Sequence, residues 1–206
     1  MRLMRLLVLT AALVSLFQVQ RAGAAILYAE GVSGDLSNNR LLPTQLVLST
    51  GVNSILATSA GSDREYFTLV LPINLLLTQL ILASYDSFDD TSFIGVQAGT
   101  TFTVAPTTLN AAGLLGWTHF GPNTVATEGT DILDNIGAGG FGATNFAPPL
   151  PSGSYTFWVQ QASSSLTSYQ LDFVVTSVPE PSTWALLAVG LLAAGALRNK
   201  PRTAAR

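Results

Sequence analysis

The sequence predicts an all-β protein, a single antiparallel β-sandwich of jelly-roll-like type formed by residues 25–178. Two runs, SYTFWVQQ at 154–161 and SYQLDFVVT at 168–176, alternate apolar and polar side chains with the period of two that is typical of strands. Clusters of Gly, Ser, Asn, Asp and Pro separate such runs, and no convincing amphipathic helix lies between them. Short strands at roughly ten-residue spacing indicate a sandwich.

Earlier runs complete the predicted sheets. EYFTLVL at 65–71 alternates in the same way. The apolar run 75–82 fits either a buried strand or a helix, and Pro72 before it favours a turn followed by a strand. The Gly-rich, weakly periodic stretch 110–150 predicts long loops over one end of the sandwich. The expected strands are 26–29, 45–49, 54–58, 65–71, 77–84, 92–97, 101–104, 154–161 and 168–176.

Charge divides the chain into three parts. The two ends carry seven of the nine basic residues, whereas residues 25–178 hold two arginines against eleven acidic residues, a net charge of −9. Such a body lacks the basic excess that sequence-independent binding of nucleic acid requires. The absence of cysteine excludes disulfides, thiolate catalysis and Cys-type zinc sites, and the single histidine, His119, excludes multi-histidine metal sites.

Residues 1–24 have the organisation of a secretory signal peptide. Two arginines precede an apolar run of about a dozen residues, shorter than the roughly 20 that a permanent membrane helix needs. Ala22 and Ala24 then give the small-residue pattern that signal peptidase accepts. We expect signal peptidase to cleave after Ala24, with Ala25 as the alternative position.

Residues 179–206 predict a membrane-directed tail. Pro179 and Pro181 precede an uncharged, Ala- and Leu-rich stretch, for which we expect a short transmembrane helix over 183–197. Roughly 15 residues rise about 22 Å, against a bilayer core of about 30 Å. A basic cluster begins at Arg198 and is expected to stay on the cytoplasmic side. A helix this short suits a temporary anchor.

This order of features, namely Pro179-Glu180-Pro181, an apolar helix and a basic cluster from Arg198, resembles the PEP-CTERM sorting signal of Gram-negative bacteria. The resemblance implies that a membrane-integral exosortase recognises Pro179, Glu180 and Pro181, and that Arg198 begins the stop-transfer cluster. It also implies export, transient anchoring in the inner membrane, and final placement at the cell envelope, the cell surface or in the extracellular biofilm matrix, where exopolysaccharide is a partner. An ordinary C-terminal membrane anchor is the alternative.

A second resemblance concerns the body. The runs DREYFTLVL at 63–71, PLPSGSYTFWVQQ at 149–161 and SYQLDFVVT at 168–176 are similar to strands of the bacterial pre-peptidase C-terminal sandwich. Members of that family are secreted accessory modules, and some bind calcium. This chain shows no peptidase domain and has a long insertion at 110–150, so the resemblance implies no accessory role.

Three carboxylates lie within five residues in YDSFDDTSF, at Asp86, Asp89 and Asp90. Carboxylate oxygens are the ligands that Ca²⁺ prefers, so these residues are the candidate calcium site and calcium is the one candidate cofactor. The spacing differs from that of an EF-hand loop, and a solvated acidic turn is the alternative interpretation.

Trp117, Phe120 and Trp158 are the large flat side chains that could stack on sugar rings; the alternative is that Trp158 packs in the second face of its sheet. We expect a structural or adhesive protein without enzymatic activity, because no G-x-S-x-G motif accompanies His119. The alternative is a secreted hydrolase that uses His119 or the acidic loop residues Glu128, Asp131 and Asp134.

Overall fold

The computed structural model describes residues 24–108, 110–161, 163–178 and 189–192. The chain divides after Thr176 into two units, and the sandwich belongs to the first. In the second, residues 189–192 are helical. Among the residues described, no helix is both long and apolar enough to cross a membrane.

Several sequence predictions fall outside this description. They are the signal peptide up to residue 23 with Ala22, the sorting residues Pro179, Glu180, Pro181 and Arg198, and most of the helix predicted over 183–197.

The described part of the first unit contains nine strands and two short helices. In chain order they are β1 (Ala25–Ala29), α2 (Glu30–Ser33), β2 (Thr44–Val47), β3 (Gly51–Ser59), β4 (Arg64–Leu71), β5 (Leu75–Ser87), β6 (Ser92–Ala98), β7 (Gly116–Phe120), α3 (Leu133–Gly137), β8 (Gly153–Gln161) and β9 (Thr167–Ser177).

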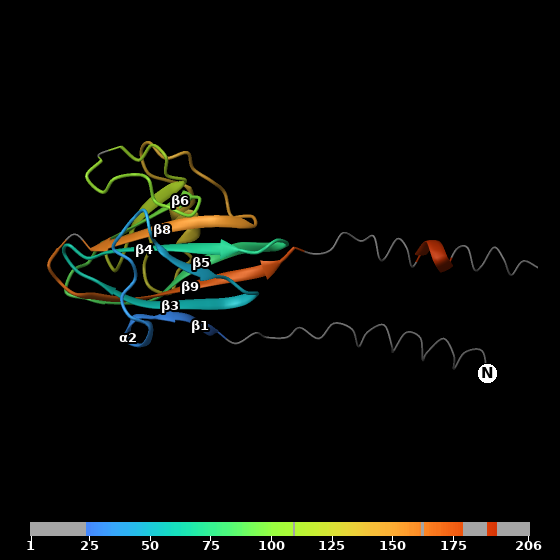
Figure 1. Cartoon of the computed structure of the whole chain (residues 1–206), viewed down its shortest axis with the longest axis horizontal. Helices are drawn as coiled ribbons and strands as arrows, with labels where there is room; N and C mark the ends of the chain where they lie inside the picture. Colours follow the sequence, from blue (N-terminus) through green and yellow to red (C-terminus); the bar gives the residue numbers. More distant parts are fainter. Residues whose placement is uncertain (1–23, 109, 162, 179–188, 193–206) are drawn as a thin grey trace, which may run out of the picture. The chain divides into compact units, whose positions relative to one another are not determined.

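The strands form two sheets, one of four strands in the order β1-β3-β9-β5 and one of five in the order β2-β4-β8-β6-β7. Figure 1 shows β4, β8 and β6 in the upper part of the sandwich and β1, β3 and β9 in the lower part. The structure is therefore consistent with the predicted all-β sandwich.

The purely antiparallel arrangement is wrong, because β1 runs parallel to β3 and β2 runs parallel to β4. Only a hairpin connection forces neighbouring strands to be antiparallel. The chain passes from β1 to the other sheet for β2 and returns for β3, so neither edge pair is joined by a hairpin. Alternation within a strand carries no information about the direction of its neighbour.

Two local predictions are also wrong. Residues 101–104 form no strand; this segment is a bend in which Phe102 is buried and its amide donates to the carbonyl of Arg40 at 2.7 Å. The strand β7 lies inside the stretch predicted to be loops, where five residues between glycine-rich segments are too few for a period to show. The run 75–82 is a strand, as Pro72 indicated, and β5 continues to Ser87.

Three phenylalanines join the two sheets at the centre of the core. Phe67 and Phe157 face each other across β4 and β8 with ring centroids 5.5 Å apart. Phe173 of the opposite sheet meets them edge-on at 6.2 and 5.5 Å. All three are fully buried, and Tyr155 and Val159 lie in the same cluster, as the alternation of β8 predicted.

The other face of the five-stranded sheet is covered as well. Tyr66 and Trp158, on the outer side of β4 and β8, form a second apolar cluster with Phe102 and Leu114 from the loop between β6 and β7. Trp158 is only 8% exposed. Trp158 therefore packs on the second face of its sheet, which was the alternative to an exposed sugar-stacking position.

Replacing Phe173 by alanine removes the ring that contacts both sheets, and we expect the free energy of unfolding to fall by about 3–5 kcal/mol. Phe88, which is fully exposed in the turn after β5, is the matched control; Phe88→Ala should stay within about 0.5 kcal/mol of the parent. Urea unfolding followed by circular dichroism measures both. Equal losses for the two variants would contradict this description of the core.

Candidate cation site

An ionisable residue occupies an interior position of β4. Glu65 lies on the same face of the strand as Phe67, two residues before it, and pairs with Val159 of β8. Its side chain is completely buried, and no N–H group or hydroxyl of the described residues donates to either carboxylate oxygen. Because an uncompensated buried charge is very costly, desolvation raises the pKa of Glu65 to about 10, with further contributions from the negative charges of Glu30, Asp63 and Asp35.

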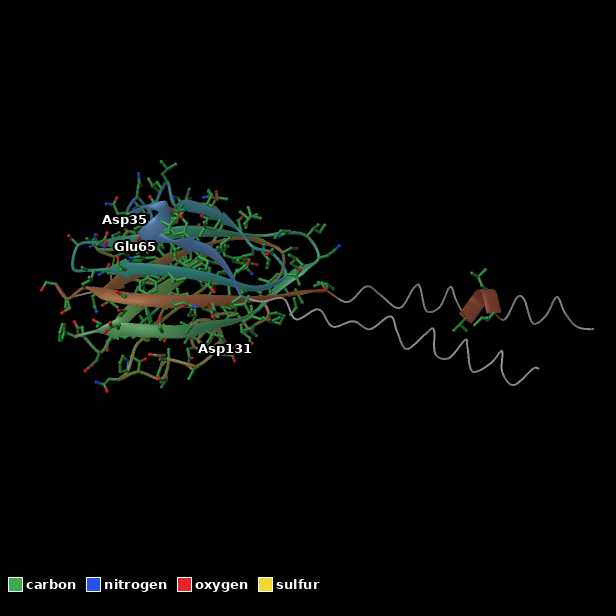
Figure 2. All side chains as sticks on the ribbon, turned by 90° about the horizontal axis from the view of Figure 1, so that it is seen from below. Asp35, Glu65 and Asp131 are labelled. Atoms are coloured by element: carbon green, nitrogen blue, oxygen red, sulfur yellow. The ribbon has the colours of Figure 1, made fainter. Side chains whose placement is uncertain are left out.

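Two more carboxylates converge on Glu65. Single carboxylate oxygens of Glu30, Asp35 and Glu65 lie within 4.8 Å of one another, and Figure 2 shows Asp35 and Glu65 at the same side of the sandwich. Glu30 opens α2, Asp35 follows that helix, and Glu65 comes from β4, so the cluster draws on three segments. We call these three residues the acidic cluster.

Hydrogen bonds from β3 of the four-stranded sheet and from the loop after α2 hold Glu30 in place. Its Oε2 accepts from the amide of Thr58 at 2.7 Å and from the Thr58 hydroxyl at 3.0 Å, and its Oε1 accepts from the amide of Leu36 at 3.3 Å. Burial nevertheless raises the pKa of Glu30, although these hydrogen bonds act in the opposite direction. Glu30 is therefore oriented before any ligand arrives.

A glycine turn brings Asp35 back toward Glu30. Gly34 has φ +88°, a left-handed conformation that favours glycine, and its amide donates to the carbonyl of Glu30 at 3.0 Å. The Tyr28 hydroxyl donates to the carbonyls of Gly34 at 2.9 Å and Asp35 at 3.3 Å. Desolvation and the charge of Asp63 raise the pKa of Asp35.

The sandwich's two arginines form their hydrogen bonds away from the acidic cluster. Arg40 donates to the carbonyls of Phe102 and Thr103, and Arg64 donates to Gln160. The buried hydroxyl of Tyr169 has no hydrogen-bond partner among the described residues. Burial first, and then the negative charge of Glu65, raise the pKa of Tyr169 well above its ordinary value.

This arrangement suits a hard cation. Ca²⁺ takes six to eight oxygen ligands, among them carboxylates and carbonyls, at about 2.3–2.6 Å. Glu30, Asp35 and Glu65 could supply carboxylate ligands, and a bound cation would replace the proton that Glu65 otherwise holds. The neighbouring Asp63 adds negative charge at the same place.

The structure does not gather the predicted calcium residues in this way. Within the described ranges, the acidic cluster is the group of three acidic side chains whose oxygens converge. Asp86 is exposed on β5, whereas Asp89 and Asp90 belong to the following turn, where Asn123 donates to Asp90 Oδ2 at 2.6 Å and the amide of Asp90 donates to Asp89 Oδ1. Asp86, Asp89 and Asp90 are close in the sequence, but within the described residues their carboxylate oxygens do not converge.

The predicted sugar-stacking residues separate into two environments. Phe120 is completely buried in the main core against Tyr85 and Tyr169, so it presents no face to a ligand. Trp117 is half-buried and lies with Trp158 on the outer face of the five-stranded sheet, with Phe93 between them.

Within the described ranges, no hydrogen bond joins the side chains of the residues named in the hydrolase alternative. His119 is exposed on β7 and contacts the rings of Phe93 and Trp117; in the described ranges no hydrogen bond joins its imidazole to a serine or a carboxylate. Asp131 Oδ1 accepts from the amides of Leu80 and Leu133, both at 3.0 Å, and thus fixes the loop before α3. Figure 2 shows Asp131 well away from Asp35 and Glu65, and Glu128 and Asp134 are exposed.

Sequence reasoning missed the acidic cluster although one signal was present. The alternation that placed Phe67, Leu69 and Leu71 on the interior face also places Glu65 there, two residues earlier. An acidic residue at an interior strand position needs a proton, a partner or a cation. Its partners Glu30 and Asp35 could not be found in this way, because the topology alone brings them to β4.

Comparison with known families identifies the end of the chain. Residues 177–200 match the PEP-CTERM protein-sorting motif, which confirms the resemblance based on Pro179, Glu180, Pro181 and Arg198. The motif marks an exported protein that is sorted by an exosortase to the envelope or the extracellular space. No curated protein matches the chain.

The pKa of Glu65 predicts how stability depends on pH without metal. Between the unfolded value of 4.5 and about 10, the folded state keeps a proton that the unfolded chain has released. The contribution of Glu65 to stability is therefore fully present below pH 4.5 and decreases as pH rises toward 10, by at most about 1.4 kcal/mol per pH unit.

Thermal unfolding in EDTA at pH 5 to 9 measures this effect. We expect Glu65→Gln to flatten the decline, since the amide cannot ionise, and Asp86→Asn, a neutralised exposed carboxylate, to retain it. An unchanged slope in Glu65→Gln would show that Glu65 does not hold the proton.

Proposed function

We propose that this chain is a non-enzymatic structural or adhesive protein of the cell envelope or extracellular matrix whose sandwich binds Ca²⁺ at the acidic cluster. The observation that carries the cation site is Glu65: it is fully buried, no N–H group or hydroxyl of the described residues donates to its carboxylate oxygens, and two further carboxylates face it. An acidic cluster on the surface alone would be an ordinary solvated patch, and the buried member distinguishes this one.

Calcium at this position would connect the two sheets. Glu65 belongs to the five-stranded sheet, whereas Glu30 follows β1 and is hydrogen-bonded to Thr58 of β3, both in the four-stranded sheet. A cation shared by these carboxylates acts as a cross-link in a chain that contains no cysteine. Calcium is abundant outside the cell, which suits an exported protein.

Processing at both ends is compatible with this role. Strand β1 begins at Ala25, next to the predicted signal-peptidase position after Ala24, and β9 ends at Ser177, before the sorting residues. Removal of both ends by signal peptidase and exosortase would leave a sandwich of net charge near −9. A strongly acidic body of this kind remains soluble and attracts cations.

We expect Ca²⁺ to raise the melting temperature of the purified protein relative to EDTA. Stabilisation follows RT ln(1 + [Ca²⁺]/Kd) and reaches about 2.7 kcal/mol at 100 times Kd. The rise should be larger at pH 8 than at pH 5.5, because protons compete with the metal for Glu65.

Differential scanning calorimetry of matched variants locates the site. Glu65→Gln and Glu30→Gln should lose the calcium response, and Asp86→Asn should keep it. If the parent protein melts at the same temperature with and without calcium at pH 8, the cation site is refuted; if Asp86→Asn abolishes the response, the metal lies in the turn after β5.

The sorting tag predicts a shortened mature protein. The intact mass of protein recovered from the producing bacterium should correspond to a chain that no longer ends at Arg206, and Glu180→Ala should leave the tail uncut and the protein in the inner membrane. Glu128→Ala, an exposed glutamate of the sandwich, is the control and should be processed normally. A parent protein that still ends at Arg206 would contradict exosortase cleavage.

A further inference from the structure

A second site candidate lies on the outer face of the five-stranded sheet. A row of aromatic rings crosses four neighbouring strands there, from Tyr66 on β4 through Trp158 on β8 and Phe93 on β6 to Trp117 on β7. Successive ring centroids are 6.0, 4.7 and 5.8 Å apart. Beside the row opens a cavity of about 300 Å³, whose lining includes Phe93, Leu114, Trp117, His119, Phe141 and Trp158.

A glycine makes this aromatic floor continuous. Gly95 on β6 pairs with Trp158 on one side and with Trp117 on the other, and therefore lies between the two indoles. The Phe93 ring lies over Gly95, only 3.1 Å from where a Cβ would be. A side chain at Gly95 would press against the Phe93 ring, so glycine lets this ring lie close to β6.

The cavity combines apolar walls with a few polar side chains. The indole Nε1 atoms of Trp117 and Trp158 are themselves buried, so the two tryptophans contribute their rings and not their N–H groups to the lining. Asn110 and the exposed His119 add polar atoms to the lining, which contains no Asp, Glu, Lys or Arg.

These properties define the chemistry of the ligand. Aromatic walls call for a flat apolar face, the polar atoms call for hydrogen-bonding groups around its edge, and an uncharged lining calls for a neutral molecule. The volume lies at the lower limit of the roughly 300–1,000 Å³ of small-molecule sites, which suits a single ring. A pyranose unit has C–H faces, a perimeter of hydroxyls and no charge.

We propose that this cavity binds one neutral pyranose unit of a polysaccharide, with Trp117 as the stacking face and His119 as a hydrogen-bonding group at the edge. The proposal deepens the adhesive role proposed above and rests on it, but it uses none of the residues of the acidic cluster. The sandwich's net charge of −9 would oppose polyanionic polymers and leaves neutral ones unaffected.

Isothermal titration calorimetry of the full purified chain tests the proposal. The probes are neutral hexasaccharides of glucose, galactose and mannose, an anionic oligogalacturonate, and the uncharged apolar dye N-phenyl-1-naphthylamine. We expect saturable binding of at least one neutral hexasaccharide and at least tenfold weaker binding of oligogalacturonate. Absence of saturable binding for all three neutral sugars, or binding of the dye alone, would overturn the proposal.

Variants place the sugar in this cavity. Trp117→Ala should weaken binding at least tenfold, His119→Ala should weaken it severalfold, and Phe88→Ala, an exposed aromatic in the turn after β5, should bind as the parent does. His119 is exposed, so its variant decides the matter if Trp117→Ala does not fold. Unchanged sugar affinity in folded His119→Ala and Trp117→Ala would overturn the assignment.

A glycine variant reaches the cavity without changing any residue that lines it. Gly140 has φ +75°, and a Cβ there would collide with the Trp117 indole. Gly140→Ala should therefore displace Trp117 and lose sugar binding, and full retention of binding would contradict the role of Trp117. Titrations in EDTA and in calcium separate the two proposals: sugar binding without a calcium response refutes only the cation site, and the converse refutes only the sugar site.

Discussion

The buried carboxyl group of Glu65 is the constraint on which this sandwich depends. Three carboxylates within 4.8 Å of one another, one of them fully buried, cannot all be ionised unless positive charge joins them. The sandwich's two arginines are hydrogen-bonded elsewhere, so within the described residues a proton on Glu65 is the available compensation, and a cation from solution could take its place. The stability of the sandwich around the acidic cluster therefore depends on the pH and on the cations in solution.

Two members of the acidic cluster belong to the segment that joins the first strands. The chain adds β1 to the edge of one sheet, passes through α2 and Asp35, and adds β2 to the edge of the other sheet. Both edge strands run parallel to their neighbours and lack the hairpins that would fix them locally. Glu30, held by Thr58, and Asp35, placed by the Gly34 turn, provide a tertiary connection for this segment instead.

Sequence alone predicted the properties that depend on local alternation. It gave the faces of β8 and β9, hence the burial of Phe157 and Phe173, and it identified the sorting element at Pro179–Pro181. It could not give strand direction at the edges, because both directions have the same period. The metal site was sought in the densest acidic segment, at Asp86, Asp89 and Asp90, whereas the acidic cluster joins residues up to 35 positions apart.

The two candidate sites differ in the charge of the residues that form them. The acidic cluster brings negative side chains of both sheets together, and such a concentration of negative charge attracts cations. The aromatic cavity lies on the outer face of one sheet, where the ten described lining residues include no Asp, Glu, Lys or Arg. Under the proposed function, such a cavity in a strongly acidic protein would select neutral ligands by shape and hydrogen bonding, because the surrounding field disfavours anions and the aromatic walls offer cations no carboxylate. Calcium would fasten the sandwich, and the opposite surface of the five-stranded sheet would remain free to bind a neutral polymer.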